Sequence, residues 1–193
     1  MDAGFAAVLG AAVGALGTGS AAIGAAVLAR SQARAQLAAE HARIIREPRK
    51  AAYAAFAEKV LADHNRLTTA MNYLVINFRP ARAAVREAAL TSARQCYESH
   101  VADSELLGHR YAQVVVEGPL RVTSTAAASS AALAAFQGEI YQCLTELEDA
   151  GHSGDDREAS MEERRTESHQ AYLEFIHAAS RAIAADGVNT MPE

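Results

Sequence analysis

Glu174 and His177 are the residues whose types and spacing come closest to a chemical site. The Glu-x-x-His spacing places a carboxylate and an imidazole on one face of a helix, where both can bind a metal ion. A two-metal carboxylate bundle needs this motif twice, together with two further inward-facing glutamates. No other histidine in the sequence has a glutamate three residues before it. We therefore predict no metal site and no cofactor, and keep Glu174 and His177 as candidate ligands only.

The rest of the sequence lacks the motifs of common enzyme classes. It contains no His-Glu-x-x-His, no phosphate-binding glycine loop ending in Lys-Ser or Lys-Thr, and no Gly-x-Ser-x-Gly. His64 and His100 fall near the apolar stripes of their helices, which favours core histidines hydrogen-bonded across a bundle. The net charge of −5 supplies no basic field for nucleic acid. We predict a protein with no catalytic residues that is not an enzyme and does not bind nucleic acid.

The elements that must position these residues are helices. The chain is rich in alanine, has no tryptophan and contains only four prolines, a composition that favours helix over sheet. Between the breaks, apolar residues recur at helical spacing. We predict an all-α fold, with an antiparallel bundle of about four long helices over residues 31–186 and a disordered tail over residues 187–193.

Prolines and one acidic segment divide this pattern. Pro80 and Pro119 are predicted to start helices, because proline is accepted in the first turn. Pro48 either starts a helix or kinks a continuous one. Residues 151–156 are predicted to form the one flexible connection. Cys96 and Cys143 are too few for a disulfide scaffold, and we expect two buried free thiols.

Two aromatic pairs predict how the bundle closes. Tyr53 and Phe56 near the start of the bundle are echoed by Tyr172 and Phe175 near its end, with the same spacing of three. In an up-down bundle the first and last helices are neighbours, so the two pairs can meet in one aromatic layer. Core packing is the main interpretation, and a peptide-binding groove is the alternative.

Residues 3–29 carry no charge, and Thr18 and Ser20 are their only polar side chains. A bilayer core takes about 20 apolar residues as a helix, so we predict a transmembrane anchor over residues 1–30. Six glycines make insertion only modestly favourable. Two alternatives stay open: a cleaved export signal, which needs a basic start that this chain lacks, and a helix buried in the core or against a partner.

A basic flank follows the uncharged stretch and predicts its orientation. It consists of Arg30, Arg34, Arg43, Arg46, Arg49 and Lys50. Positive residues stay on the cytoplasmic side, so we expect a single-pass protein of the cell membrane with its N-terminus outside and the bundle in the cytoplasm. The lipid bilayer is then one partner, and the same flank can touch anionic head groups.

A stripe of small residues runs along the predicted anchor. It consists of Gly10, Gly14, Gly17, Ala21 and Gly24. In a bilayer such a stripe lets two helix backbones approach closely, which predicts a homo-oligomer. A Gly- and Ala-rich segment also produces such spacings by chance.

Three stretches resemble small actinobacterial membrane-anchored helical proteins. They are Arg49-Lys50-Ala51-Ala52-Tyr53-Ala54-Ala55-Phe56, the break Glu117-Gly118-Pro119 before an alanine-rich helix, and the closing Ala171-Tyr172 followed by Phe175. The resemblance implies a membrane-anchored helical fold, with no known activity and no functional residues to carry over. The predicted function is a membrane-anchored scaffold or interaction module for an unknown protein partner. The alternatives are a membrane-active effector that oligomerises through its glycine-rich helix, or a bundle metalloprotein.

Overall fold

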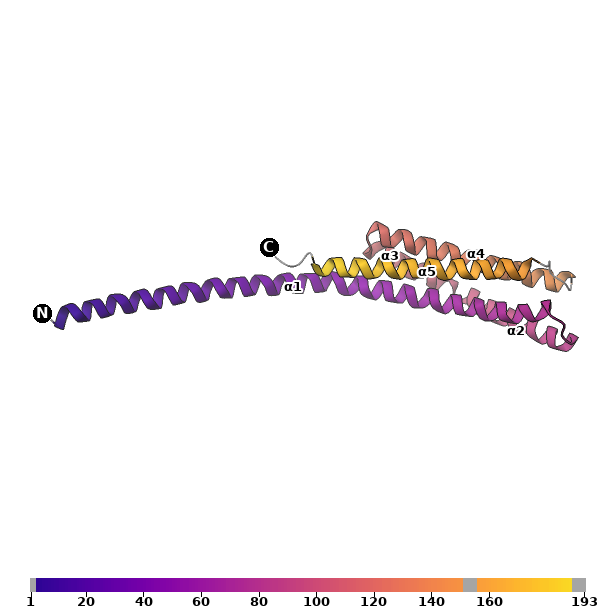
Figure 1. Ribbon diagram of the computed structural model, residues 1–193, viewed down its shortest axis with the longest axis horizontal. Helices are drawn as coiled ribbons and strands as arrows, with labels where there is room; N and C mark the ends of the chain where they lie inside the picture. Colours follow the sequence, from indigo (N-terminus) through magenta and orange to yellow (C-terminus); the bar gives the residue numbers. More distant parts are fainter. Residues whose placement is uncertain (1–2, 151–155, 189–193) are drawn as a thin grey trace. The chain divides into compact units, whose positions relative to one another are not determined.

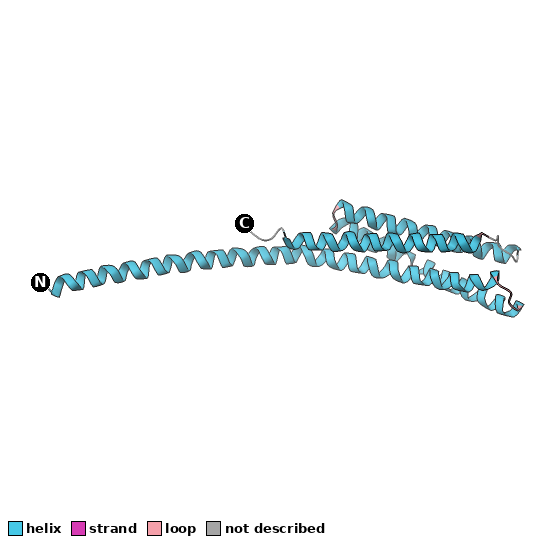
Figure 2. Cartoon of the chain, viewed as in Figure 1, coloured by secondary structure: helices cyan, strands magenta, loops and turns pink. Residues whose placement is uncertain are grey.

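The chain is all-helical throughout the residues that the computed structural model describes, 3–150 and 156–188. Side chains are described for these residues except 3–27, 38, 42, 45, 150 and 186–188. Within this part Figure 2 shows helices and their connections, with no strand. The elements are α1 (Ala3–Val75), η1 (Ile76–Phe78), α2 (Ala83–Ala102), α3 (Ser104–Glu117), α4 (Leu120–Ala150) and α5 (Arg157–Val188). The predicted all-α class is confirmed.

The chain divides into two units, the first ending at Ile45 and the second running from Arg46 to Asn189. In the first unit, the large apolar side chains of Leu28, Leu37 and Ile44 are exposed. Among the described residues, no helix is long and apolar enough to cross a membrane. The structure therefore does not support the predicted transmembrane anchor over residues 1–30, whose many glycines and alanines add little apolar surface. The side chains of the glycine stripe lie outside the described residues.

The second unit is the helical bundle. Figure 1 shows α4 and α5 side by side, and the chain direction alternates from α1 to the α2–α3 pair, to α4 and to α5. The sequence predicts one long helix between Pro80 and Pro119. This prediction is wrong, because the segment is broken into α2 and α3. At the break Asp103 leaves the helical conformation at φ −97° and ψ 4°, while its amide still donates to the carbonyls of His100 and Val101.

The prolines act in three different ways. Pro48 lies inside α1, which continues through it, so of the two alternatives for this residue a helix start is ruled out. Pro119 directly precedes α4, as predicted. Pro80 does not start a helix, since α2 begins three residues later at Ala83. The predicted flexible connection falls mostly on residues 151–155, outside the described residues, as does the predicted tail beyond residue 188.

Two apolar cores hold the bundle together. The first core consists of Ala52, Tyr53, Phe56, Ala57, Val60, Val114, Val122, Ala126, Phe175, Ala178 and Ala179. The second core consists of Leu67, Ala70, Met71, Leu74, Ala93, Leu133, Phe136, Ile140, Cys143, Leu144, Leu147 and Met161. Each core takes side chains from α1, α4, α5 and the α2–α3 pair. Burial of these side chains is the main favourable term in folding.

The predicted aromatic layer is confirmed in the first core for Tyr53, Phe56 and Phe175, whereas the ring of Tyr172 lies against that of His169, at 6.3 Å between ring centroids. Phe175 lies edge-on to Phe56 at 4.8 Å between ring centroids and to Tyr53 at 6.3 Å. Tyr111 of α3 joins them, 6.4 Å from Phe56. Edge-to-face rings of this kind add about 0.5–1.5 kcal/mol per pair to the burial energy. Their burial makes core packing, not a peptide groove, the role of these rings.

Two details of the predicted core differ. Helical spacing places Val85 on one apolar face with Ala89 and Cys96, but Val85 is exposed in the structure. Cys143 is buried and Cys96 is half-buried, so the expectation of two buried thiols holds for Cys143 only. Neither cysteine forms a disulfide.

Candidate functional site

Buried polar side chains lie between the two apolar cores. They are Lys59, Asp63 and His64 of α1, His100 of α2, Ser129 of α4 and Ser168 of α5. We call these six residues the polar layer. Asp63, His64, His100, Ser129 and Ser168 each fall, along their own helix, between residues of the first core and residues of the second. All four arms of the bundle therefore interrupt their apolar stripes at corresponding positions.

Asp63 is the centre of the layer and has no exposed surface. Its Oδ1 accepts a hydrogen bond from Lys59 Nζ at 2.7 Å and lies 3.3 Å from His100 Nδ1. Arg66 Nη1 lies 3.8 Å from the same oxygen. Asp63 Oδ2 is buried with no hydrogen-bond partner among the described residues. A buried carboxylate is tolerated only when nearby cations offset its desolvation, and Lys59 and Arg66 supply them here.

A chain of polar contacts runs from Asp63 to the bundle surface. His100 Nε2 lies 3.2 Å from Gln137 Oε1, and Gln137 Nε2 donates to Tyr97 Oη at 3.5 Å. In hydrolases, an Asp that accepts a hydrogen bond from His Nδ1 orients a catalytic imidazole, whose second ring nitrogen faces a nucleophile. His100 Nδ1 makes no such hydrogen bond among the described residues. Here the second nitrogen faces an amide, and His100 is only 2% exposed. The arrangement joins α1, α2 and α4 through polar contacts.

His64 of α1 contacts α5. Its Nδ1 lies 3.2 Å from Ser168 Oγ, and its ring lies 5.6 Å from that of His169 on α5. Burial, followed by the positive charges that His169 and Arg165 can carry, holds the pKa of His64 below its ordinary value. The prediction that His64 and His100 are histidines hydrogen-bonded across the bundle is confirmed.

The break between α2 and α3 is tied to this layer. Arg66 donates to Asp103 Oδ2 at 2.6 Å, and this hydrogen bond lowers the pKa of Asp103. His100 stands in the last turn of α2, three residues before the break. The polar layer and the helix break therefore form one connected feature.

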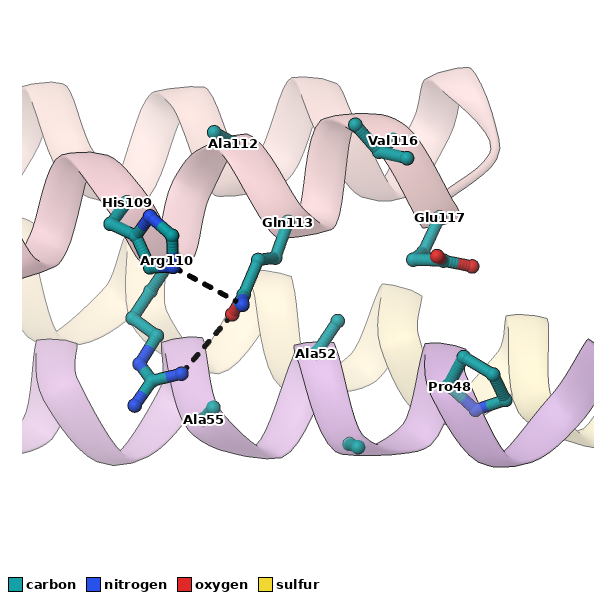
Figure 3. A pocket seen from close by; sticks show the side chains of 10 residues that line it. Pro48, Ala52, Ala55, His109, Arg110, Ala112, Gln113, Val116 and Glu117 are labelled. Atoms are coloured by element: carbon teal, nitrogen blue, oxygen red, sulfur yellow. Dashed lines mark hydrogen bonds between the residues drawn. The ribbon is translucent and has the colours of Figure 1, made fainter.

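The accessible candidate site is a groove between α1 and α3. It has a volume of about 560 Å³. Its α1 wall consists of Pro48, Ala51, Ala52 and Ala55, and its α3 wall of His109, Arg110, Ala112, Gln113, Val116 and Glu117. Figure 3 shows His109 and Arg110 at one end and Pro48 and Glu117 at the other. We call this feature the α1–α3 groove.

Local sequence explains why the groove is open. Its alanines at positions 51, 52, 55 and 112 end at Cβ and leave the space between the helices unfilled. Gln113 crosses that space and bonds to Arg110 at 3.2 Å, while its Nε2 lies 3.4 Å from His109 Nε2 (Figure 3). Below the groove, Arg49 Nε donates to the carbonyl of Glu117 at 2.7 Å and joins α1 to the end of α3.

One exposed apolar side chain lies in the groove wall, and a second follows it four residues later in the chain. Val116 in its wall is 80% exposed, and Leu120, just after the turn at Gly118, is 84% exposed. The turn itself requires glycine, because a Cβ on Gly118 would lie 2.7 Å from the carbonyl oxygen of Val114 and 3.2 Å from Tyr53 Oη. Large apolar side chains exposed together are typical of contact surfaces.

The structure does not bring the residues that the sequence singled out into one site. Glu174 and His177 are exposed on α5, and Glu174 accepts from Gln170 Nε2 at 3.3 Å. Among the described residues, no group of three His, Cys, Asp or Glu side chains could hold a metal ion. Of the basic flank, Arg30, Arg34, Arg43 and Lys50 are exposed, whereas Arg46 and Arg49 are half-buried.

Sequence reasoning missed Asp63 and Lys59. Their positions in the sequence could have revealed them. Asp63 lies on the apolar stripe formed by Phe56, Val60, Leu67 and Met71. A carboxylate on such a stripe becomes buried and therefore needs a nearby cation. Lys59, four residues earlier, meets that need. The α1–α3 groove had no sequence signal, because alanines that line a groove and alanines on a solvated helix surface look the same.

Comparison with protein-family models, with curated proteins and with solved structures found no match to this chain.

Proposed function

We propose that this protein is an interaction module, not an enzyme, and that the α1–α3 groove is its docking surface. The observation that carries the proposal is the groove itself, an open cleft between two helices with alanine walls and the exposed Val116 at its edge. A helix or extended segment that fills such a cleft buries apolar surface on both sides. A catalytic role of the polar layer is disfavoured by burial, since Asp63 is 0% and His100 2% exposed.

The test places a photo-crosslinking amino acid at Ala112 in the full chain, in cells. Ala112 lies in the groove wall, whereas Ala134 is an equally small position on α4 outside the groove and serves as the matched control. We expect a protein adduct from position 112 that weakens at least about tenfold when Val116 is replaced by aspartate. Equal adducts from positions 112 and 134 would contradict docking in the groove.

Attachment at a membrane is a separate part of the proposal. It rests on the sequence, in which residues 3–29 carry no charge and the basic flank follows them. We expect the full chain to stay in the membrane pellet through an alkaline carbonate wash, and a chain lacking residues 1–30 to be released. Recovery of the full chain in the supernatant would remove the anchor and leave the groove proposal intact.

A further inference from the structure

The α1–α3 groove carries both halves of a self-complementary surface. Val116 projects from it, with 80% of its surface exposed. Beside it lies a depression of about 560 Å³, and four of the ten residues that line it are alanines. A surface with a projection and a matching depression can pair with its own copy about a two-fold axis, because each copy then fills the other. A different partner would have to supply both shapes.

The charges of the α3 wall are also complementary to those of a second copy. Arg110 and Glu117 lie at opposite ends of the groove, seven residues and about 10 Å apart along α3. When two α3 helices cross antiparallel about an axis near Gln113, Arg110 of one copy faces Glu117 of the other, and the reverse pair forms at the opposite end. The two-fold contact thus contains two opposite-charge pairs and no like-charge pair at those positions.

The exposed face of α3 also permits close approach. A Cβ on Gly108 would meet no atom within 4 Å, so this helix surface is open. Gly108 and Ala112 are four residues apart and on one face, which lets a second helix backbone come near. We propose that the α1–α3 groove docks a second copy of this chain, with the two α3 helices antiparallel. This deepens the proposed function by naming the partner of the same groove.

Charge reversal in the full chain tests the pairing. In a homodimer of Arg110→Glu the new carboxylate faces Glu117, and in a homodimer of Glu117→Arg the new guanidinium faces Arg110. We expect each variant to dimerise at least about tenfold more weakly than the natural chain, because two attractive pairs become two repulsive ones. A mixture of the two variants should recover mixed dimers, since an Arg110→Glu chain beside a Glu117→Arg chain has an opposite-charge pair at both ends again.

The readout is crosslinking through an added cysteine. Ala112→Cys lies next to the proposed two-fold axis, and Ala134→Cys is the matched control on α4; Cys143 is buried and Cys96 half-buried. A short bis-maleimide should join two Ala112→Cys chains and should not join Ala134→Cys chains above the level of the natural sequence. Tags of different mass identify the mixed dimers, and circular dichroism confirms that each variant is folded.

The outcomes separate this inference from the function on which it rests. Loss of dimer in both single variants with recovery in the mixture supports the antiparallel pairing. Dimers that ignore the charge reversals, or that disappear only when Gly10 and Gly14 become leucine, overturn it. An adduct at position 112 that joins a different protein also overturns it, while the groove remains a docking surface. No adduct of any kind at position 112 contradicts the proposed function as well.

Discussion

The polar layer and the α1–α3 groove differ in both polarity and exposure. In the polar layer, carboxylate, ammonium and imidazole groups touch one another, and all six residues are buried. The groove is open, but most of its walls are methyl groups and aliphatic stems. The buried polar side chains are thus enclosed by the bundle, whereas the groove is open and lined mainly by apolar surface.

The same contrast predicts where mutations act. A buried charge is stabilised only by its partners, so a change in the polar layer alters the free energy of unfolding. Val116 on the groove wall is largely solvated, so we expect its replacement to alter binding and to leave the fold intact. The predictions below test this division, from the largest effect to the smallest.

Replacement of Asp63 by alanine should destabilise the bundle most. It leaves Lys59 buried without its carboxylate at 2.7 Å, which costs about 3–5 kcal/mol of unfolding free energy. Urea unfolding followed by circular dichroism measures the loss. The double variant Asp63→Leu, Lys59→Met is the control, because removing both charges should cost far less. Equal losses in the two variants would show that the ion pair is not what the layer depends on.

Replacement of Gly118 by alanine should have the next largest effect. The added methyl group would lie 2.7 Å from the carbonyl oxygen of Val114, so the turn between α3 and α4 must move. We expect a loss of about 1–3 kcal/mol in urea unfolding. Gly138→Ala in α4 is the matched control, because a Cβ there meets nothing within 4 Å and should stabilise the helix by about 0.5–1 kcal/mol. A neutral Gly118→Ala would mean that Tyr53 and the turn adjust freely.

His64 predicts how the stability depends on pH. Its pKa in the folded protein is held below the ordinary value of 6.5, so the unfolded chain binds a proton more readily. The stability is therefore fully present above about pH 6.5 and is lost as the pH falls from there through the folded pKa. Thermal melting between about pH 7.5 and 5 measures this, with His64→Gln as the comparison, which should show a smaller dependence. An unchanged slope in that variant would assign the effect to other groups.

Replacement of Val116 by serine should change the stability least. The side chain is 80% exposed, so the unfolding free energy should stay within about 0.5 kcal/mol of the natural value. Dimerisation or partner binding through the groove should nevertheless weaken. Val85→Ser is the matched control, an exposed valine on α2 away from the groove. A large loss of stability in Val116→Ser would place this residue in the core and contradict the division between layer and groove.

Much of the fold was predictable because helix period and core burial are encoded in the same pattern. The buried stripes at Leu67, Met71, Ile140 and Leu144, and the meeting of Phe56 with Phe175, follow from spacing alone. The break at Asp103 was not predicted, because an aspartate without a neighbouring proline or glycine carries no strong signal. The side chain of Asp103 accepts a hydrogen bond from Arg66 of α1, which is 37 residues away along the chain.

The candidate sites were less predictable for a related reason. His64 and His100 were recognised as core histidines, but their partners Ser168 and Gln137 come from other helices. The motif of Glu174 and His177 has the right spacing for a metal, yet helical spacing does not decide whether that face points inward. Both residues point outward, and the bundle places Phe175 inward instead.

By itself, the sequence determined the helical class, the positions of most breaks, the buried stripes and the absence of familiar catalytic motifs, because these depend on local preference and on the period of the helix. The tertiary structure alone decided which polar side chains meet in the layer, where the second arm breaks, and that alanines of α1 and α3 face an open groove. These features depend on the rotation of one helix against another, and that rotation is set by how side chains from all four arms pack together.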